Sequence, residues 1–366
     1  MKTTKVIVTL LAGTLLTMAA QAQVELTITG STAFRSIALD RAGSLFDGGS
    51  AVTITNDAAA GKLTFSGTVS NAVPSLGSTP VKVRLSFSGS ASGMIAVKNS
   101  TPVNTAEAAG GVTVNKVPDL ALSDVFPGSA TPAIAESSFN RTVVGVVPFA
   151  FVANNALVNG GVTNLTRDQA VLLMTSSGSV NGIDGMPASF LGANPASPLY
   201  NSPVYLTGRD SGSGTRITTE KVIGFIGNPI LWATNGAGNY VLTNGYSSGA
   251  SERQVISAKP EAIGYLGLGD AATIAATSKI LAYNGVPYSH TNVATGSYAI
   301  WGYEHMVNRA GGLSANQTLV KNAFVAAITN PNYQRTNVLY APNFVPLSDM
   351  QVERGADGGL ITSKNF

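Results

Sequence analysis

The sequence contains no cysteine and few charged residues. The absence of cysteine excludes disulfides, thiolate metal sites and a lipid-anchored cysteine, so the stability of the fold must come from its core. Only 11% of the residues are charged, and Lys2 and Lys5 are two of the 22 basic residues that face 19 acidic ones. The chain beyond them is close to neutral, which excludes the basic surface that a nucleic-acid partner requires.

Histidine is scarce as well, and this limits the chemistry of catalysis. His290 and His305 are the two histidines, and they form no HExxH pair. The glycine-rich stretch GSGT lacks the lysine of a Walker sequence. We therefore expect neither an enzyme nor a metal site, and no cofactor.

The segment 1–22 has the composition of a secretory signal peptide. Lys2 and Lys5 precede an apolar stretch, and Ala20-Gln21-Ala22 supplies a small-residue cleavage site. No later stretch offers the roughly 20 consecutive apolar residues of a membrane span. The sequence thus predicts cleavage near Ala22 and a soluble, monomeric protein that is periplasmic or secreted.

Strand and helix patterns alternate along the chain. The stretches VELTITG, VKVRLSFS and SPVYLTG each read as a strand that leads through glycines into a helix. VVGVVPFAFVANN and EAIGYLGLGD read as buried strands, whereas SYAIWGYEHMVN and QTLVKNAFVAAIT read as helices. The region from Gly48 to Pro80 is rich in small polar residues and predicts a hairpin or loop insertion. This alternation predicts an α/β architecture with mainly parallel sheets.

Three of these turns share one chemistry. Small hydroxyl and glycine residues lie between strand and helix at Gly30–Phe34, Gly89–Gly93 and Ser211–Thr215. In parallel sheets such turns lie at the carboxyl ends of the strands, where ligands bind. Each helix start offers unpaired N–H groups and a partial positive charge. The pattern therefore predicts a site for an oxyanion.

Two charged residues lie close to these turns. Arg209 precedes Ser213 by four residues and could bind the same anion bidentately, or it could pair with Asp210. Asp124 ends the stretch VPDLALSD. It could accept a proton that phosphate retains and sulfate lacks, or it could serve as a cap or turn residue.

Six motifs in order resemble one family. TGSTAF, SGSASGMI, LALSD, GRDSGSGTR, EAIGY and TGSYAIWGY together resemble the phosphate-binding receptors of bacterial ABC transporters. The resemblance implies an α/β, two-lobed type II periplasmic binding protein fold, with mixed, mainly parallel sheets and a ligand cleft between the lobes. It also implies inorganic phosphate as ligand and an inner-membrane ABC permease as partner.

The same resemblance implies a site and a division into lobes. Arg209 and the Ser213-Gly214-Thr215 turn would contact the anion, Ser90 would supply a hydroxyl, and Asp124 would accept the proton. In the first loop, Thr32 would bind with the N–H of Ala33 beside it, or the N–H of Phe34 would do so instead. Lobe one would comprise 23–148 and 268–366, and lobe two 149–267, with VVPFAFVANN and EAIGYLG as crossing strands.

Two alternatives stay open on the sequence. One is a receptor of the same fold for another oxyanion or a small organic acid. The other is a secreted structural or surface-interaction protein that keeps the fold, which the polar insertion and the low surface charge favour.

Overall fold

The computed structural model describes residues 23–48, 53–57, 61–108 and 111–364. The predicted signal peptide lies outside the described residues, as do 49–52 and 58–60 of the predicted insertion. Within the described ranges, no helix combines the length and the apolar character needed to cross a membrane.

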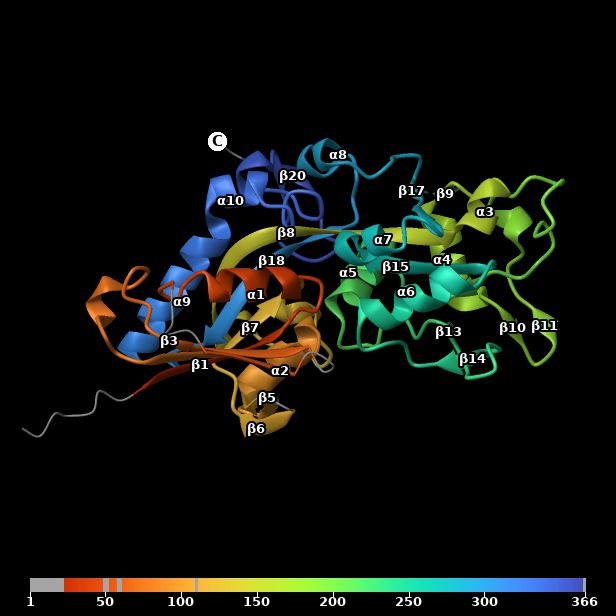
Figure 1. Ribbon diagram of the computed structural model, residues 1–366. Coiled ribbons are helices and arrows are strands. Elements are labelled where there is room, and N and C mark those ends of the chain that lie inside the picture. Colours follow the sequence, from red (N-terminus) through yellow and green to blue (C-terminus); the bar gives the residue numbers. More distant parts are fainter. Residues whose placement is uncertain (1–22, 49–52, 58–60, 109–110, 365–366) are drawn as a thin grey trace, which may run out of the picture.

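One large mixed sheet runs through the molecule (Figure 1). Its strands lie side by side in the order β12 (Tyr205–Leu206), β15 (Ala262–Gly267), β8 (Phe139–Asn154), β18 (Trp301–Arg309), β7 (Leu120–Ser123), β1 (Val24–Gly30), β4 (Val81–Ser86), β3 (Lys62–Gly67) and β2 (Thr53–Asp57), and β16 (Ser278–Ile280) also pairs with β8. The predicted α/β class is confirmed.

Parallel pairing is confined to two places in this sheet. Strand β1 is parallel to β4 and β7, and β12 is parallel to β15. The other ladders are antiparallel, including the β2–β3 hairpin that the predicted insertion adds at one edge. The expectation of a mainly parallel sheet is wrong, because hairpins and the long antiparallel pairing of β15 and β18 with β8 surround the parallel strands.

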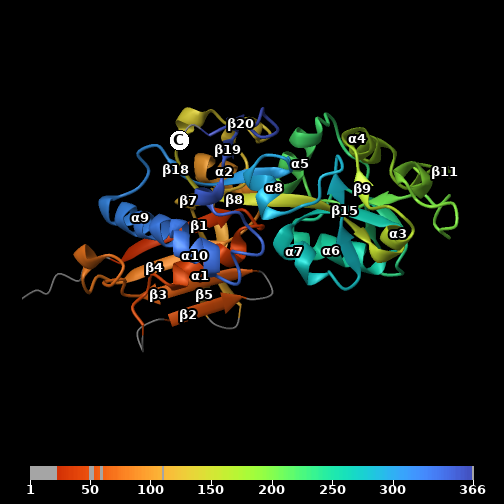
Figure 2. The ribbon, with the colours of Figure 1, turned by 90° about the horizontal axis from the view of Figure 1, so that it is seen from above.

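Strand β8 joins the two lobes. Strand β18 pairs with it as far as Pro148, and β15 pairs with it from Phe149 onward. Its continuous apolar sequence follows from burial, because every residue from Val146 to Ala153 is buried. We call the part of the molecule around β1, β4, β7 and β18 lobe one and the part around β15 lobe two (Figure 2).

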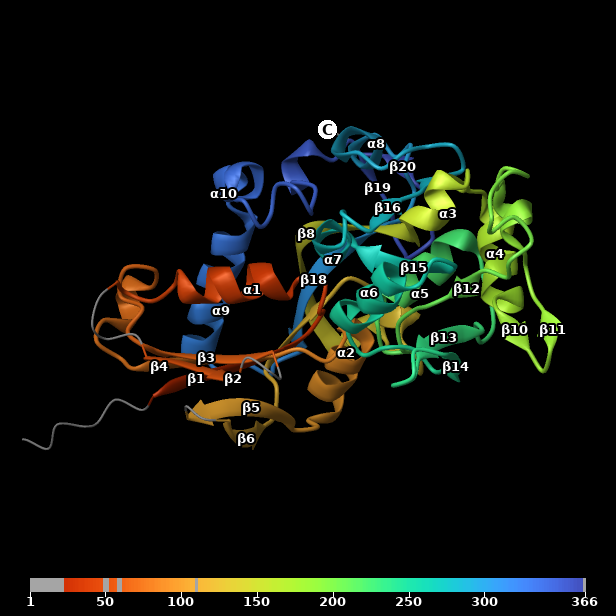
Figure 3. The same cartoon turned by 45° about the vertical axis from the view of Figure 1, so that its right-hand side comes forward.

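Helices and short hairpins cover this sheet (Figure 3). The helices are α1 (Arg35–Gly43), α2 (Ser90–Asn99), α3 (Asn155–Asn159), α4 (Arg167–Ser176), α5 (Gly214–Ile223), α6 (Gly249–Ala258), α7 (Leu268–Thr273), α8 (His290–Ala294), α9 (Ala315–Thr329) and α10 (Pro331–Thr336). The two-stranded pairs are β5 (Val103–Ala108) with β6 (Val112–Lys116), β9 (Asn164–Leu165) with β17 (Ala282–Tyr283), β10 (Ser179–Val180) with β11 (Ile183–Asp184), β13 (Leu231–Thr234) with β14 (Tyr240–Thr243), and β19 (Val352–Glu353) with β20 (Thr362–Ser363).

One predicted helix is wrong. The stretch SYAIWGYEHMVN contains most of β18, which is buried along nearly its whole length. A strand buried on both faces lacks the alternation of a half-buried strand, so its apolar pattern cannot be told from that of a buried helix. The predicted helix QTLVKNAFVAAIT is confirmed as α9, and its cap Ser314 forms a capping box with Gln317.

Candidate functional site

The starts of α1, α2 and α5 meet where the predicted glycine turns lie. None of these helices carries a side-chain cap, as is also true of α6 and α7, whereas α4 and α9 have complete capping boxes. The first N–H groups of a helix have no partner within the helix. The N–H of Phe34 at α1 donates to Ser31 Oγ and that of Ala91 in α2 donates to the carbonyl of Gly212, and the other first N–H groups of α1, α2 and α5 remain available to an anion.

Two glycines let lobe one place its helix starts side by side. Gly30 has a φ of +112°, and a side chain there would overlap the carbonyl oxygen of Leu122. A Cβ atom on Gly93 would lie 2.5 Å from the Cα atom of Gly30. Only glycine allows α2 to start this close to the end of β1.

Asp124 lies at the centre of this arrangement and is 1% exposed. The Ser31 hydroxyl donates to its Oδ2 at 3.2 Å, and the Ser90 hydroxyl donates to its Oδ1. The carboxylate therefore binds residues from two other segments instead of capping its own turn. Burial raises the pKa of Asp124 above its ordinary value, while the Ser90 and Ser31 hydroxyls and Arg209 oppose that rise.

Arg209 reaches from lobe two toward lobe one and is 2% exposed. Its Nε donates to the carbonyl of Tyr246 at 3.0 Å, and one terminal nitrogen donates to Thr32 Oγ1 at 3.1 Å and to the carbonyl of Ser247 at 2.8 Å. Asp210 instead accepts the backbone N–H of Gly212 at 3.1 Å. The alternative of a local pair between Arg209 and Asp210 is wrong.

The start of α5 packs directly on Asp124. Gly214 is the first residue of α5, and a Cβ atom there would overlap Asp124 Oδ1 and lie 2.7 Å from Ser90 Oγ. The backbone N–H of Ala91 in lobe one donates to the carbonyl of Gly212 in lobe two at 3.1 Å. The two lobes are in contact at the predicted anion site.

We expect Gly214→Ala to weaken anion binding at least about fivefold, since overpacking of a closed contact costs roughly 1–3 kcal/mol. Titration calorimetry measures the effect. Gly236→Ala is the matched control, because no atom lies within 4 Å of the added methyl group there. Equal affinity of both variants would contradict the closed contact at Gly214.

The structure brings all the predicted site residues to this place. Ser213 and Thr215 flank Gly214 and are buried, and the Ser213 side chain does not cap its helix. Ala33 lies beside Gly267 of lobe two, and the N–H of Phe34 donates to Ser31 Oγ at 3.3 Å. Their role as ligand contacts stays a prediction.

Sequence reasoning missed Ser31 and Glu304. Ser31 lies inside the quoted motif TGSTAF and provides the hydroxyl that binds Asp124. Glu304 is 0% exposed, and the charge of Asp124 acts on its ionisation. A carboxylate inside the apolar run of β18 was the signal that could have found it.

Asp357 is a further buried acid near Asp124. It accepts the N–H of Phe126 at 2.8 Å. Burial raises the pKa of Asp357 to about 6, with the negative charge of Asp124 as a smaller contribution. A carboxyl whose pKa is higher in the folded state stabilises the fold less as the pH rises from its unfolded pKa through its folded pKa.

We therefore expect Asp357→Asn to reduce the decrease in the free energy of unfolding that occurs as the pH rises. Relative to wild type, its free energy of unfolding should improve by about 2 kcal/mol between pH 4 and pH 8. Urea titrations at both pH values measure this difference. Parallel pH curves for the two proteins would show that Asp357 does not titrate in this range.

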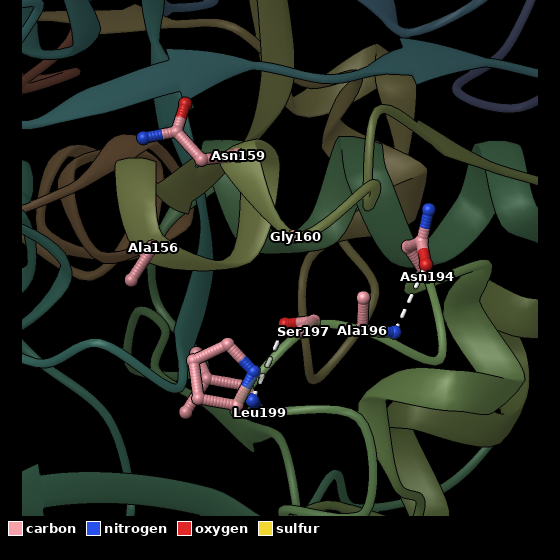
Figure 4. A pocket seen from close by; sticks show the side chains of 8 residues that line it. Ala156, Asn159, Gly160, Asn194, Ala196, Ser197 and Leu199 are labelled. Atoms are coloured by element: carbon pink, nitrogen blue, oxygen red, sulfur yellow. Dashed lines mark hydrogen bonds between the residues drawn. The ribbon is translucent and has the colours of Figure 1, made fainter.

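A surface pocket of about 430 Å³ lies elsewhere, beside α3 in lobe two (Figure 4). Its polar side chains serve their own loop, since Asn194 Oδ1 accepts the N–H of Ala196 and Ser197 Oγ accepts the N–H of Leu199. No charged residue lines it. The pocket therefore has no positive charge that would balance the negative charge of an anion.

Comparison with known proteins finds the same resemblance as the sequence motifs. The phosphate-binding protein PstS of Bacillus subtilis is 28% identical over 155 residues, which are 42% of this chain and 45% of that protein. The matched part is thus less than half of that relative. No protein-family model matches the chain.

Solved structures match over a much larger part of the chain. A candidate phosphate ABC transporter substrate-binding protein from Clostridium perfringens, with bound phosphate, has a TM-score of 0.55 at 15% identity and covers 88% of this chain and 99% of its own. An ABC-type phosphate transport receptor from Vibrio cholerae has a TM-score of 0.52 at 16% identity, with 87% and 99% covered. The chain has the two-lobed fold of these receptors. The resemblance that the motifs predicted is confirmed, and the similar proteins are binding proteins.

Proposed function

We propose that this chain is an exported receptor that binds inorganic phosphate between its lobes and delivers it to an ABC permease in the inner membrane. The observation that carries the proposal is the convergence of Arg209 and Asp124, one buried cation and one buried acid, on three uncapped helix starts. The proteins that the chain resembles in sequence and fold are described as phosphate receptors.

Arg209 and Asp124 have different roles in anion recognition. The guanidinium of Arg209 offers charge-assisted hydrogen bonds to two oxygen atoms of a tetrahedral anion. The N–H groups at the starts of α2 and α5 and the hydroxyls of Ser213 and Thr215 would hold the other oxygen atoms. The Ser90 hydroxyl has one hydrogen, so it would turn from Asp124 to the anion when the anion binds. Asp124 accepts the proton of the phosphate, and a fully ionised anion such as sulfate has no proton to give. Discrimination between anions thus follows from one carboxylate.

We propose that binding is coupled to the relative position of the lobes. Lobe one comprises 23–148 and 268–366, and lobe two comprises 149–267, with β8 and β15 as the crossing strands. Closure over the ligand would create the surface that the permease binds. The receptor acts as a monomer without cofactor or catalytic activity, and it reaches the periplasm after cleavage near Ala22.

Titration calorimetry on the mature protein tests the function. The protein is unfolded and refolded to remove bound ligand, then titrated at neutral pH with phosphate, sulfate and molybdate. Tight one-to-one binding of phosphate with no heat from sulfate is the expected result. Preference for another anion would assign a different receptor of the same fold, and binding of none would favour the surface-interaction protein.

A further inference from the structure

Glu304 is a second fully buried carboxyl group at the anion site. It lies on β18, which is antiparallel to β7 and pairs His305 with Ser123. The ladder ends at this pair, so Glu304 and Asp124 are the next residues of β18 and of the chain after β7 at the same end of the ladder. Two buried carboxyl groups that interact in this way repel each other when both are ionised.

Among the described residues, no positive charge acts on the ionisation of Glu304. Within the described part of the chain, neither of its oxygen atoms makes a hydrogen bond of ordinary geometry. The groups that act on its ionisation are Asp124, which opposes it, and the Ser31 hydroxyl, which favours it. Burial, and then the charge of Asp124, raise the pKa of Glu304 well above its ordinary value.

The described elements packed around Glu304 add no cation that acts on it. The titratable and charged groups that face Glu304 or its neighbour Asp124 are Tyr340, Asp357 and Arg209. Arg209 acts on Asp124, while Tyr340 donates its hydroxyl to the carbonyl of Val345 at 3.5 Å. An ionised Glu304 would thus place a second negative charge beside the anion, and burial makes such a charge costly.

The hydroxyl of Ser31 can accept one further hydrogen bond. A serine hydroxyl has one hydrogen to donate and two lone pairs that accept. Ser31 donates to Asp124 and accepts from the N–H of Phe34. One lone pair remains, and a protonated Glu304 has the O–H group that would fill it.

We propose that Glu304 is a positioning residue for anion selection: it stays a neutral acid whose O–H supports the Ser31 hydroxyl, so that Asp124 alone offers negative charge to the ligand. This inference rests on the proposed phosphate-binding function. The proton on Glu304 keeps the two carboxyl groups at a total of one negative charge, which one proton on the phosphate can satisfy.

Two variants separate this role from a structural one. Glu304→Gln keeps a neutral donor of similar shape, so its phosphate affinity should stay within about threefold of wild type. Glu304→Leu removes the donor, and its affinity should fall about tenfold, the usual effect of one lost hydrogen bond. Circular dichroism establishes that each variant is folded.

An infrared spectrum reports the proton directly and does not depend on ligand. A protonated carboxylic acid has a carbonyl stretch that a carboxylate lacks, and at neutral pH the wild type should show one such band that Glu304→Gln has lost. Equal bands in both proteins would overturn the proposal, as would full affinity in a folded Glu304→Leu variant.

The two measurements distinguish the two hypotheses. A wild type that binds phosphate but loses no acid band on substitution would refute the role of Glu304 and leave the receptor function intact. A wild type that shows the band but binds no phosphate would refute the receptor function, and with it the selecting role.

Discussion

Replacing Arg209 by alanine should weaken phosphate binding at least about 30-fold. Arg209 is the buried cation that interacts with Asp124 and that links Thr32 of lobe one to the carbonyls of Tyr246 and Ser247 in lobe two. Loss of one partner of a buried, hydrogen-bonded charge pair costs about 2–5 kcal/mol. Titration calorimetry with phosphate measures the loss.

The control must separate lost binding from lost stability. Glu252 is 0% exposed, and Arg209 is the neighbour that most favours its ionised form, so alanine at position 209 also leaves a buried acid uncompensated. The double variant Arg209→Ala with Glu252→Gln should recover thermal stability without recovering binding. Arg253→Ala, which breaks a partly exposed ion pair with Asp270, is the matched arginine control and should bind normally. If the double variant bound phosphate as tightly as wild type, Arg209 would have no role at the anion.

The local part of this site could be predicted from the sequence. The turns at Gly30–Phe34, Gly89–Gly93 and Ser211–Thr215 each connect a strand with a helix, and helix starts bind anions by their own geometry. The order of the motifs then predicted the fold, which the solved structures confirm. The part of the site that lies within one turn of the chain could therefore be predicted from the sequence.

The long-range part could not be predicted in this way. Glu304 comes to the same end of the sheet as Asp124 because β18 pairs with β7, and the sequence pattern of β18 reads as a helix. The β5–β6 hairpin of lobe one was also not predicted, although the buried Arg84 donates to the carbonyl of Ala106 within it. Cross-strand neighbours depend on register, which a single sequence does not give for buried strands.

Anion binding at this site depends on the protonation states of its buried acids. Asp124, Glu252 and Glu304 are all fully buried, and burial raises the pKa of each. Arg209 is the cation that acts on the first two. One buried cation cannot balance three ionised acids and an incoming anion, so neutral acids must supply the difference. Anion selection therefore depends on which acid holds a proton.

The second large effect is expected for Asp124→Asn. This variant should reduce the preference for phosphate over sulfate by about 100-fold or more, mainly because sulfate binds more tightly. In the wild type, sulfate would face the Asp124 carboxylate without a shared proton, and two such charges in a buried site cost several kcal/mol. Asparagine removes the charge and offers an N–H donor to the anion instead. Competition between the two anions in calorimetric titrations measures the preference.

The other end of β7 provides the matched control. Asp119 directly precedes β7, where its carboxylate accepts the N–H of Thr27 at 2.8 Å and the side-chain amide of Gln317 at 3.1 Å. Asp119→Asn makes the same chemical change at a structural position, so it should alter the free energy of unfolding and leave the anion preference unchanged. If both variants kept the wild-type preference, the carboxylate of Asp124 would not select the anion, and selection would have to come from the geometry of the helix starts alone.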